Sequence, residues 1–472
     1  TKKKFTQDPY LESARNAFRQ NELARAEDFI KASIESNSTN PIAHAYYGEI
    51  LLALGRPDEA GDSYQIATDI CPKEGTFWHG LGLAKFRAGS LGAGINALRC
   101  AIELMPGNSE VHNNLGNLQK ESGNLRDAVS SYKRALELKP DFGEAFGNLG
   151  VVFLGLGELL DAEKALSTAA QLRPMDPVIL TNLGCVFAAL GRMTDATRWH
   201  RKALKLDAKN TAALNNLAIS LKDKGQIKNA IKVYDRLIEL APQDYTARSN
   251  RLMCLNYRDC CDGITIFRSH REWEENLKKP IKSFIPSSKT SRGPLKVGIV
   301  SPDLWTHSVA NFLIPLFKYY DREEFHLTCY SDTQVPDETT EMLKRCSNSW
   351  REIRNLGDEF VAKRIKSDTI DILIDLAGHT GNNRLTLFAR RAAPIQINWL
   401  GYPTTTGLSQ MDFRLTDVIA DPPGLTEAFH SEVLVHLQPC FLCYSPPNEI
   451  PLLKVKHRPV TFGSFNNFAK LT

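Results

Sequence analysis

The chain has 472 residues, a length that predicts two or three domains at roughly 100–200 residues each. Apolar residues make up 42% and charged residues 24%, a composition typical of folded globular proteins that excludes a disordered or fibrous chain. The formal net charge of +4 is too weak over this length to indicate nucleic acid or an anionic membrane as the main partner. Ten cysteines are scattered without a repeating framework, which favours a reducing compartment.

A repeat of 34 residues is the strongest feature of the first half of the chain. One series marks the repeat: Gly48, Gly82, Gly116, Gly150 and Gly184, with Ala218 next in phase. A second glycine series and a proline series keep the spacing: Gly55, Gly89, Gly123, Gly157, Gly191 and Gly225, and Pro72, Pro106, Pro140, Pro174 and Pro242. Two alanine series fall between them: Ala60, Ala128, Ala162, Ala196 and Ala230, and Ala67, Ala101, Ala135, Ala169 and Ala203. Each unit therefore predicts a helix, a tight turn at the second glycine, a closely packed antiparallel helix, and a proline that ends it.

These units resemble the tetratricopeptide repeat. Six units are clear between about residue 40 and residue 243, and a degenerate unit with Ala14, Asn21 and Ala26 in phase precedes them. Because a single unit cannot bury its apolar face, we expect the units to stack into an α-solenoid, a right-handed superhelix with an extended concave surface. Such a surface is expected to bind partners.

A phased polar position follows the same period. Asparagines stand two places before the packing glycine or its equivalent: Asn114, Asn148, Asn182, Asn216 and Asn250. Their carboxamides could bind the backbone of an extended peptide without reading its side chains, or they could merely cap or bridge neighbouring repeats. Earlier repeats carry Tyr46 and Gly80 at this position, so the ladder is expected only in the C-terminal part of the groove.

The second half of the chain changes character. After Pro242 the period fades into helical segments, and a basic, serine-rich stretch from Lys278 to Pro294 has the composition of a linker. Short strand-like runs then alternate with helical segments such as DETTEMLKRC and EFVAKRIKSD. The runs are LKVGIVS, FHLTCYS, IDILIDLAG, IQINWLGY, DFRLTDVIA, EVLVHL and VTFGSFN. This alternation predicts an α/β lobe with a mostly parallel sheet.

Residues that could act in binding or catalysis follow three of these runs. Parallel sheets bind their ligands at this place, just after the carboxyl ends of the strands. His307, beside Thr306, follows the first run, and His379 lies between two glycines after the third. A hydroxyl-rich turn follows IQINWLGY: Pro403, Thr404, Thr405, Thr406 and Gly407. These residues could converge on a sugar or a phosphate with one histidine as acid or base, or each could be structural.

The sequence gives little support for metal or cofactor chemistry. Cys440 and Cys443 have C-x-x-C spacing but lie in a strand-like run, QPCFLCY, without a second Cys or His pair nearby. No phosphate-binding P-loop, dinucleotide-binding glycine motif or zinc motif occurs in the sequence.

Six segments, in this order after the repeats, carry a resemblance to a known family. They are GIVSPDLWTHSVANF, DLAGHTGNNRL, APIQINWLGYPTTTGL, DFRLTDVIADPPG, LQPCFLCYSPP and VTFGSFNNFAKLT. Together they resemble the O-GlcNAc transferase family of glycosyltransferases, family 41, and most closely its SPINDLY branch. The resemblance implies a GT-B enzyme with two Rossmann-like lobes. Such an enzyme transfers a sugar from a nucleotide sugar to Ser or Thr of intracellular proteins, with inversion and without a metal or other cofactor.

The resemblance also implies roles for particular residues. His307 matches the family's active-site histidine, which either takes the acceptor proton or positions sugar and acceptor. Pro403 and Thr405, with Thr404 between them, match a turn that approaches the donor sugar, whereas His379 matches a Gly-His-Thr segment and Thr306 precedes the active-site histidine. An asparagine ladder lines the family's superhelix, so the resemblance favours peptide binding by the five phased asparagines. The donor is either GDP-fucose or UDP-N-acetylglucosamine.

We therefore predict tetratricopeptide repeats over residues 1–243, a helical transition and linker over 244–294, and the first catalytic lobe over 295–472. The missing initiator Met and the end of the chain at Thr472, soon after Asn466 and Asn467, predict a fragment that lacks the second catalytic lobe and is inactive alone. Expected partners are protein substrates, with a homodimer through the repeats as an option, and neither nucleic acid nor a membrane. The expected location is the cytoplasm or nucleus. The alternative is a noncatalytic scaffold that binds proteins through its repeats.

Overall fold

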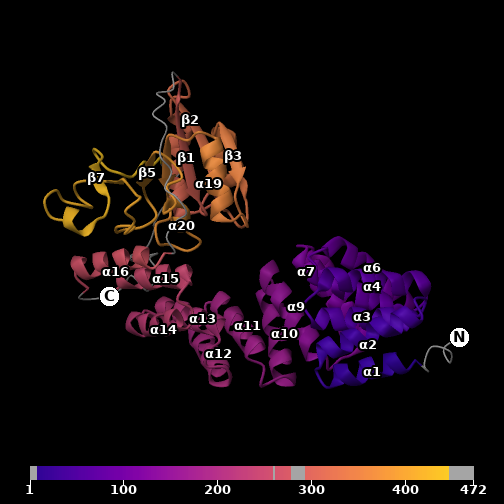
Figure 1. Ribbon diagram of the computed structural model, residues 1–472. Helices are drawn as coiled ribbons and strands as arrows, with labels where there is room; N and C mark the ends of the chain where they lie inside the picture. The colour runs from indigo at the N-terminus through magenta and orange to yellow at the C-terminus, as the bar shows by residue number, and fades with distance from the viewer. Residues whose placement is uncertain (1–7, 259–260, 278–292, 446–472) are drawn as a thin grey trace, which may run out of the picture. The chain divides into compact units, whose positions relative to one another are not determined.

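The computed structural model describes residues 8–258, 261–277 and 293–445. The chain divides into two compact units, residues 1–210 and 211–472 (Figure 1). The expected segment VTFGSFN, Asn466, Asn467 and most of the expected linker lie outside the described residues. None of the helices within the described ranges is long and apolar enough to cross a membrane.

The described part of the first unit consists of antiparallel helix pairs. Its helices are α1 (Pro9–Arg19), α2 (Leu23–Ser36), α3 (Pro41–Ala53), α4 (Pro57–Ile70), α5 (Gly75–Arg87), α6 (Leu91–Leu104), α7 (Ser109–Glu121), α8 (Leu125–Leu138), α9 (Gly143–Leu156), α10 (Leu159–Leu172), α11 (Pro177–Ala189) and α12 (Met193–Leu206). Side chains such as Asn108 and Asp176 cap the first helix of a pair by accepting from its free backbone N–H groups. The predicted helical repeats are confirmed.

The two glycine series have different physical roles. At the turns, the second series adopts φ between +72° and +82°, a left-handed conformation that favours glycine. The first series lets the two helices of a pair approach closely: a Cβ at Gly116 would lie 2.6 Å from the ring of Tyr132, and one at Gly150 would lie 2.5 Å from Leu166. Both alanine series are fully buried. The phased small residues therefore specify the hairpin packing that the sequence predicted.

The second unit begins with four helices: α13 (Thr211–Asp223), α14 (Ile227–Leu240), α15 (Tyr245–Leu255) and α16 (Gly263–Glu275). The pair α15 and α16 corresponds to the segment whose repeat period had faded. Their side chains hydrogen-bond to the α/β lobe, through Ser249, Asn256 and His270 among others. The two compact units divide at Asn210, inside the repeat region.

The rest of the described second unit is a parallel sheet of seven strands with the helices that connect them. The strands are β1 (Leu295–Ser301), β2 (Phe325–Ser331), β3 (Ser349–Glu352), β4 (Ile372–Asp375), β5 (Ile395–Asn398), β6 (Phe413–Thr416) and β7 (Val433–His436). Their spatial order is β3-β2-β1-β4-β5-β6-β7, the Rossmann-like order. Central β1 pairs in parallel with both β2 and β4, so that Ile299 lies between Cys329 and Ile374.

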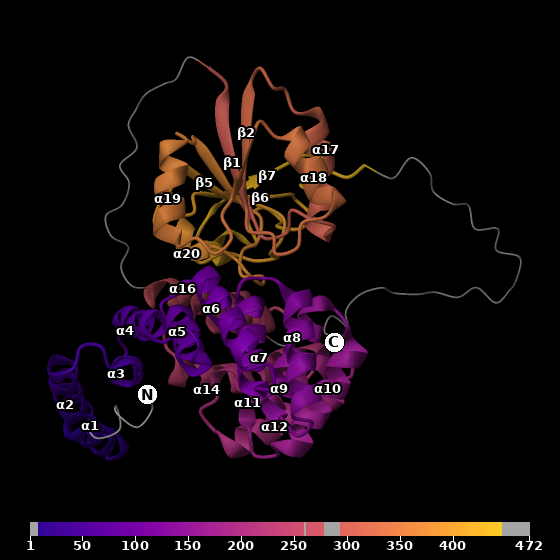
Figure 2. The same ribbon diagram turned by 90° about the vertical axis from the view of Figure 1, so that its right-hand side faces the viewer.

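Helices cover both faces of this sheet. They are α17 (Ser308–Tyr319), α18 (Glu338–Cys346), α19 (Asp358–Ser367) and the short α20 (Leu385–Phe388), followed by the 3-10 turn η2 (Glu427–Phe429). Figure 2 shows α17 and α18 on one side of the sheet and α19 on the other. The core on the α17 side includes Ile299, Leu313, Phe317 and Trp399.

Two expectations for strands differ from the structure. Strand β3 was not predicted, because its sequence SWRE contains one apolar residue and two charged ones. The run QPCFLCY was expected to be a strand, but the strand ends at His436 and the cysteines follow in irregular backbone. Pro439 cannot donate the hydrogen bond that a continued parallel pairing needs.

Candidate active site

A cavity of about 430 Å³ lies at the carboxyl ends of β1, β4 and β5. Its lining includes Asp303, His307, Phe312, Thr380, Asn382 and Leu400. The chain leaves β1 toward β2 on one side and β4 toward β5 on the other, so the cavity stands at the point where the strand order reverses. Open α/β sheets bind their ligands at this point.

His307 lies at the start of α17 and lines the cavity. Its side chain is 35% exposed, and its ring stacks on that of Trp305 with centroids 5.9 Å apart. The backbone N–H of Val309 donates to Nδ1 at 3.3 Å, and Asp303 Oδ2 lies 3.9 Å from the same nitrogen. In this geometry Nδ1 accepts from Val309, so the neutral ring carries its proton on Nε2, and the 3.9 Å between Nδ1 and Asp303 Oδ2 is too long for a hydrogen bond.

Asp303 is a site residue that the sequence reasoning missed. Its side chain is 18% exposed and lines the same cavity. Burial raises the pKa of Asp303, and the nearby His307 opposes that rise. The signal available in the sequence was an acid placed between a strand end and a histidine four residues later.

Polar side chains hold both ends of residues 378–384, here called the cavity loop. Asp375, at the end of β4, accepts from the backbone N–H groups of Ala377 at 3.1 Å and Gly378 at 2.8 Å, and from Asn398 Nδ2 at 2.9 Å. Burial raises the pKa of Asp375 to about 6, although these hydrogen bonds favour its charged form. At the other end of the loop, the Arg384 guanidinium forms 2.8 Å ion pairs with Asp332 and Asp358.

Backbone strain marks two lining residues. Asn382 and Leu400 have φ of +57° and +69°, the left-handed region that costs a leucine roughly 1–2 kcal/mol. The next residue, Gly401, packs directly against the backbone of Leu376, and a Cβ there would lie 2.1 Å from the Leu376 carbonyl oxygen. Strained residues of this kind gather at functional sites.

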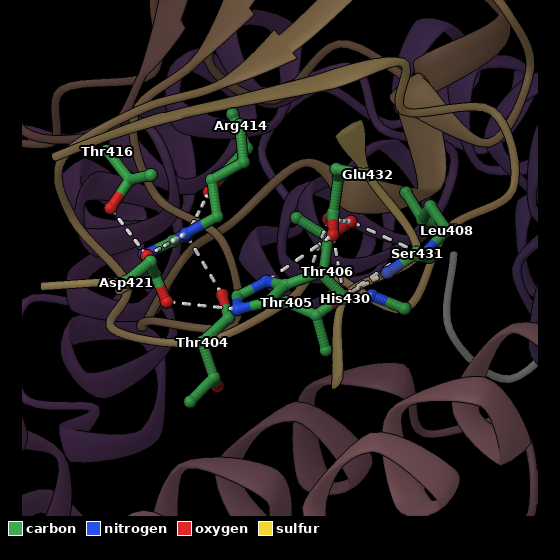
Figure 3. A network of polar contacts seen from close by, with 12 residues as sticks. Thr404, Thr405, Thr406, Leu408, Arg414, Thr416, Asp421, His430, Ser431 and Glu432 are labelled. Carbon is green, nitrogen blue, oxygen red and sulfur yellow. Dashed lines mark hydrogen bonds and ion pairs between the residues drawn. The ribbon is translucent and has the colours of Figure 1, made fainter. Parts of the chain in front are cut away.

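The hydroxyl-rich turn is not part of the cavity lining. Figure 3 shows that Thr405 and Thr406 point to Glu432, which accepts from the Thr405 hydroxyl at 2.6 Å, the Thr406 backbone N–H at 2.7 Å and the Thr406 hydroxyl. Both threonines are fully buried, whereas Pro403 is exposed. The Thr404 hydroxyl donates to Asn256 Oδ1 at 3.3 Å. The hydroxyls of all three threonines are thus bonded to protein side chains, and none of them lines the cavity.

Arg414 and Glu432 build this turn, and neither was singled out from the sequence. Arg414 is 5% exposed and donates to the carbonyl oxygen of Thr404 at 2.9 Å (Figure 3). It also donates to Asn398 Oδ1 at 2.6 Å and to the carbonyl oxygen of Tyr402 at 2.9 Å. Nothing in the sequence points to them, because Glu432 lies 26 residues after Thr406 and its partners meet only in the folded sheet.

His379 belongs to the cavity loop but does not line the cavity. It is fully buried, and both ring nitrogens contact protein atoms: Nε2 is 2.8 Å from the carbonyl oxygen of Thr406, and Nδ1 is 3.0 Å from Ser249 Oγ. Thr306 is exposed beside the cavity, where its backbone N–H donates to Asp337 Oδ2 at 2.8 Å. Of the predicted donor-side residues, the structure therefore brings His307 alone into the lining.

All five phased asparagines are partly exposed. Asn114 Nδ2 lies 2.8 Å from His79 Nε2, and Asn148 Nδ2 donates to Asn113 Oδ1 at 3.1 Å. These two bonds join neighbouring helix pairs, as in the bridging interpretation. The Oδ1 atoms of the carboxamides have no part in these bonds, so peptide binding also stays a prediction. The exposed Cys440 and Cys443 belong to no group of metal-ligating side chains within the described ranges.

Comparisons with known proteins agree with this division of the chain. Residues 272–458 match the family described as glycosyl transferase family 41. Residues 11–75 match a tetratricopeptide repeat, and residues 85–266 match the C-terminal domain of cilia and flagella-associated protein 70.

Curated relatives match part of the chain. It is 40% identical over 242 residues to a probable UDP-N-acetylglucosamine–peptide N-acetylglucosaminyltransferase SPINDLY of Oryza sativa subsp. japonica, which covers 49% of this chain and 26% of that protein. It is 32% identical over 150 residues to the Arabidopsis thaliana protein SEC of the same printed activity, covering 31% of this chain and 15% of that protein. The chain thus matches about a quarter or less of the length of these relatives.

A solved structure adds the fold. A mutant O-GlcNAc transferase of Thermobaculum terrenum superposes with a TM-score of 0.60 at 30% identity, covering 66% of this chain and 60% of that chain. The repeats, the Rossmann-like sheet and the matched segments agree with one another. Within the chain, a tetratricopeptide repeat array therefore precedes a segment, residues 272–458, that matches glycosyl transferase family 41.

Proposed function

We propose that this chain is part of a protein O-glycosyltransferase that transfers a sugar from a nucleotide sugar to Ser or Thr hydroxyls. The observation that carries the proposal is the position of His307: partly exposed, beside a carboxylate, in the cavity at the reversal point of a Rossmann-like sheet. The names of the relatives, which are printed as transferases that act on peptides, support the same reaction class.

The proposed chemistry needs a base that takes the acceptor proton. The base form arises when the His307 ring gives up the bond from Val309 and carries its proton on Nδ1, directed at Asp303. Nε2 then presents a lone pair to the cavity. The acceptor oxygen then bonds to the sugar carbon that releases the nucleotide diphosphate, with inversion, while the hydroxyl proton passes to Nε2. Asp303 would also stabilise the imidazolium that forms.

The surroundings of His307 fit a sugar and a hydroxyl-bearing side chain. The volume of about 430 Å³ lies within the range of roughly 300–1,000 Å³ that small-molecule sites occupy. Thr380 and Asn382 provide polar groups at its edge, and Phe312 and Leu400 provide apolar walls. In our proposal the partly exposed asparagines of the repeats hold the acceptor chain.

Transfer assays with two donors test the reaction and its donor. The protein expressed from its full coding sequence is incubated with an acceptor protein and radiolabelled UDP-N-acetylglucosamine or GDP-fucose, in parallel and without added metal. We expect label to enter acceptor Ser or Thr from one donor. The printed names favour UDP-N-acetylglucosamine, whereas the SPINDLY-like segments favour GDP-fucose. Acceptor binding without transfer from either donor would reject the proposal and favour the scaffold.

A further inference from the structure

Five side chains, four of them buried and one half-buried, join the helices α15 and α16 to the α/β lobe, and we call them the clamp. They are Ser249 and Asn256 of α15 and its end, His270 of α16, and His379 and Tyr402 of the lobe. All of them belong to the second unit. The proposed reaction uses none of these groups directly, because none of them lines the cavity.

The hydrogen bonds of the clamp fix the tautomer of each histidine. A carbonyl oxygen only accepts, so His379 donates from Nε2–H to Thr406, and its bare Nδ1 accepts from the Ser249 hydroxyl. In the same way His270 donates from Nδ1–H to Ile266, at 2.7 Å, and its Nε2 accepts from the Tyr402 hydroxyl at 2.8 Å. Asn256 Nδ2 donates to the Tyr402 oxygen at 2.8 Å. Every polar atom in this chain of bonds has a partner of the right kind.

The rings of the clamp are also closely packed. The His379 ring meets Trp273 at 4.9 Å, His270 at 5.0 Å and Tyr402 at 5.3 Å between centroids, all edge to face. Burial lowers the pKa of His379 well below its usual value, and the neighbouring His270 lowers it further. The imidazole is therefore neutral and held on all sides, which suits a mechanical role and not proton transfer.

Residues of the clamp are adjacent in the chain to the cavity lining and to one of the phased asparagines. His379 belongs to the cavity loop, and the next residue, Thr380, lines the cavity. Ser249, its partner on α15, directly precedes Asn250, the last asparagine of the phased series. One hydrogen bond of 3.0 Å therefore links the helix that carries Asn250 with the loop that forms the cavity wall.

We propose that His379 is a positioning residue that holds the cavity loop in register with α15, so that an acceptor bound along the helices α13 and α15 of the second unit meets the cavity in one fixed geometry. The inference rests on the proposed function. In this inference His379 does not contact the sugar. It acts through Thr380, which lines the cavity, and through Ser249 on α15. Misplacing a reacting group by about 1 Å can cost about a hundredfold in rate, so a change of register between α15 and the cavity loop would slow transfer to an acceptor that the helices hold.

The test compares two acceptors of one sequence: a long protein segment that reaches the repeat helices and a short peptide that reaches only the cavity. The measured quantity is the ratio of their kcat/KM values, which reports how well the repeats present the acceptor. The variants are Ser249→Ala, His379→Leu and His379→Gln. A glutamine amide can still donate to Thr406 and accept from Ser249.

A matched control is His200→Leu. His200 is 1% exposed and packs against Gly184 in the repeats, and leucine already stands at the equivalent position in two other repeats, at Leu98 and Leu166. This control removes a buried histidine without touching the clamp. Hydrogen exchange of the backbone amides at residues 377–382 is measured on each protein as a readout independent of activity.

We expect the long-to-short ratio to fall about tenfold to a hundredfold in Ser249→Ala and His379→Leu, with short-peptide turnover nearly unchanged. His379→Gln should restore much of the ratio, His200→Leu should keep it, and hydrogen exchange at 377–382 should rise only in the first two variants. An equal loss for both acceptors, or an unchanged ratio in a folded His379→Leu protein, would overturn the inference and leave the proposed function standing. Wild-type protein that transfers no sugar to either acceptor would refute the proposed function and with it this inference.

Discussion

Acid should weaken the junction between α16 and the lobe through His270. This histidine is fully buried, and burial lowers its pKa from 6.5 to about 4, although the bond to Ile266 and the nearby Glu432 oppose the shift. The unfolded chain then binds a proton more readily than the folded one between pH 6.5 and 4, so stability falls as the pH falls through this window. At 1.36 kcal/mol per pH unit the loss from pH 7 to pH 5 is about 2 kcal/mol.

The assay compares wild type with His270→Gln by urea unfolding at several pH values between 7.5 and 5. The glutamine amide can donate to Ile266 and accept from Tyr402 but does not titrate. His379 and His430, the other titratable imidazoles facing this position, remain in both proteins. The difference between the two curves therefore reports the burial of His270 together with its effect on the pKa of His379. We expect the stability advantage of wild type to shrink by about 2 kcal/mol from pH 7 to pH 5. Parallel stability curves for the two proteins would refute the assignment of a neutral His270.

Two further predictions concern the repeats. Gly116→Ala places a Cβ 2.6 Å from a buried tyrosine ring and should lower the free energy of unfolding by roughly 1–3 kcal/mol, measured by urea unfolding. In the control Gly107→Ala the new Cβ meets open space, so the free energy of unfolding should change little. Equal effects of the two substitutions would contradict the packing role of Gly116. Converting Asn148, Asn182 and Asn216 together to alanine should weaken the capture of acceptor peptides of unrelated sequence to a similar extent, measured by fluorescence anisotropy, because a carboxamide reads the peptide backbone. Unchanged affinities would leave these asparagines with the bridging role alone.

Much of the fold could be predicted because its signals are local. The turn glycines at Gly55 and its equivalents need a left-handed backbone, and the packing glycines face a large residue of the next helix, so the repeat period carries the hairpin geometry. The strands were predictable where apolar residues run together, as in β1. Strand β3 was missed because an edge strand of four mostly polar residues has no such run.

The site was predictable only in part, because its geometry depends on contacts distant in the sequence. His307 was found since it follows a strand end, and the cavity is built there. His379 and Thr405 occupy comparable places in the sequence but are fully buried, His379 against α15 and α16 and Thr405 against Glu432. Those partners lie 130 and 27 residues away, so neither contact is visible in a local pattern.

The central claim is that the cavity around His307 transfers a sugar to protein hydroxyls, and one comparison tests it most directly. Transfer of labelled sugar to an acceptor protein is measured for wild type, His307→Ala and His326→Ala, together with acceptor binding. His326 is a partly buried histidine of β2 that does not line the cavity, which makes it a matched control. The account predicts a loss of about a hundredfold or more in His307→Ala alone, with acceptor binding unchanged in all three proteins. Equal transfer by wild type and His307→Ala would contradict it.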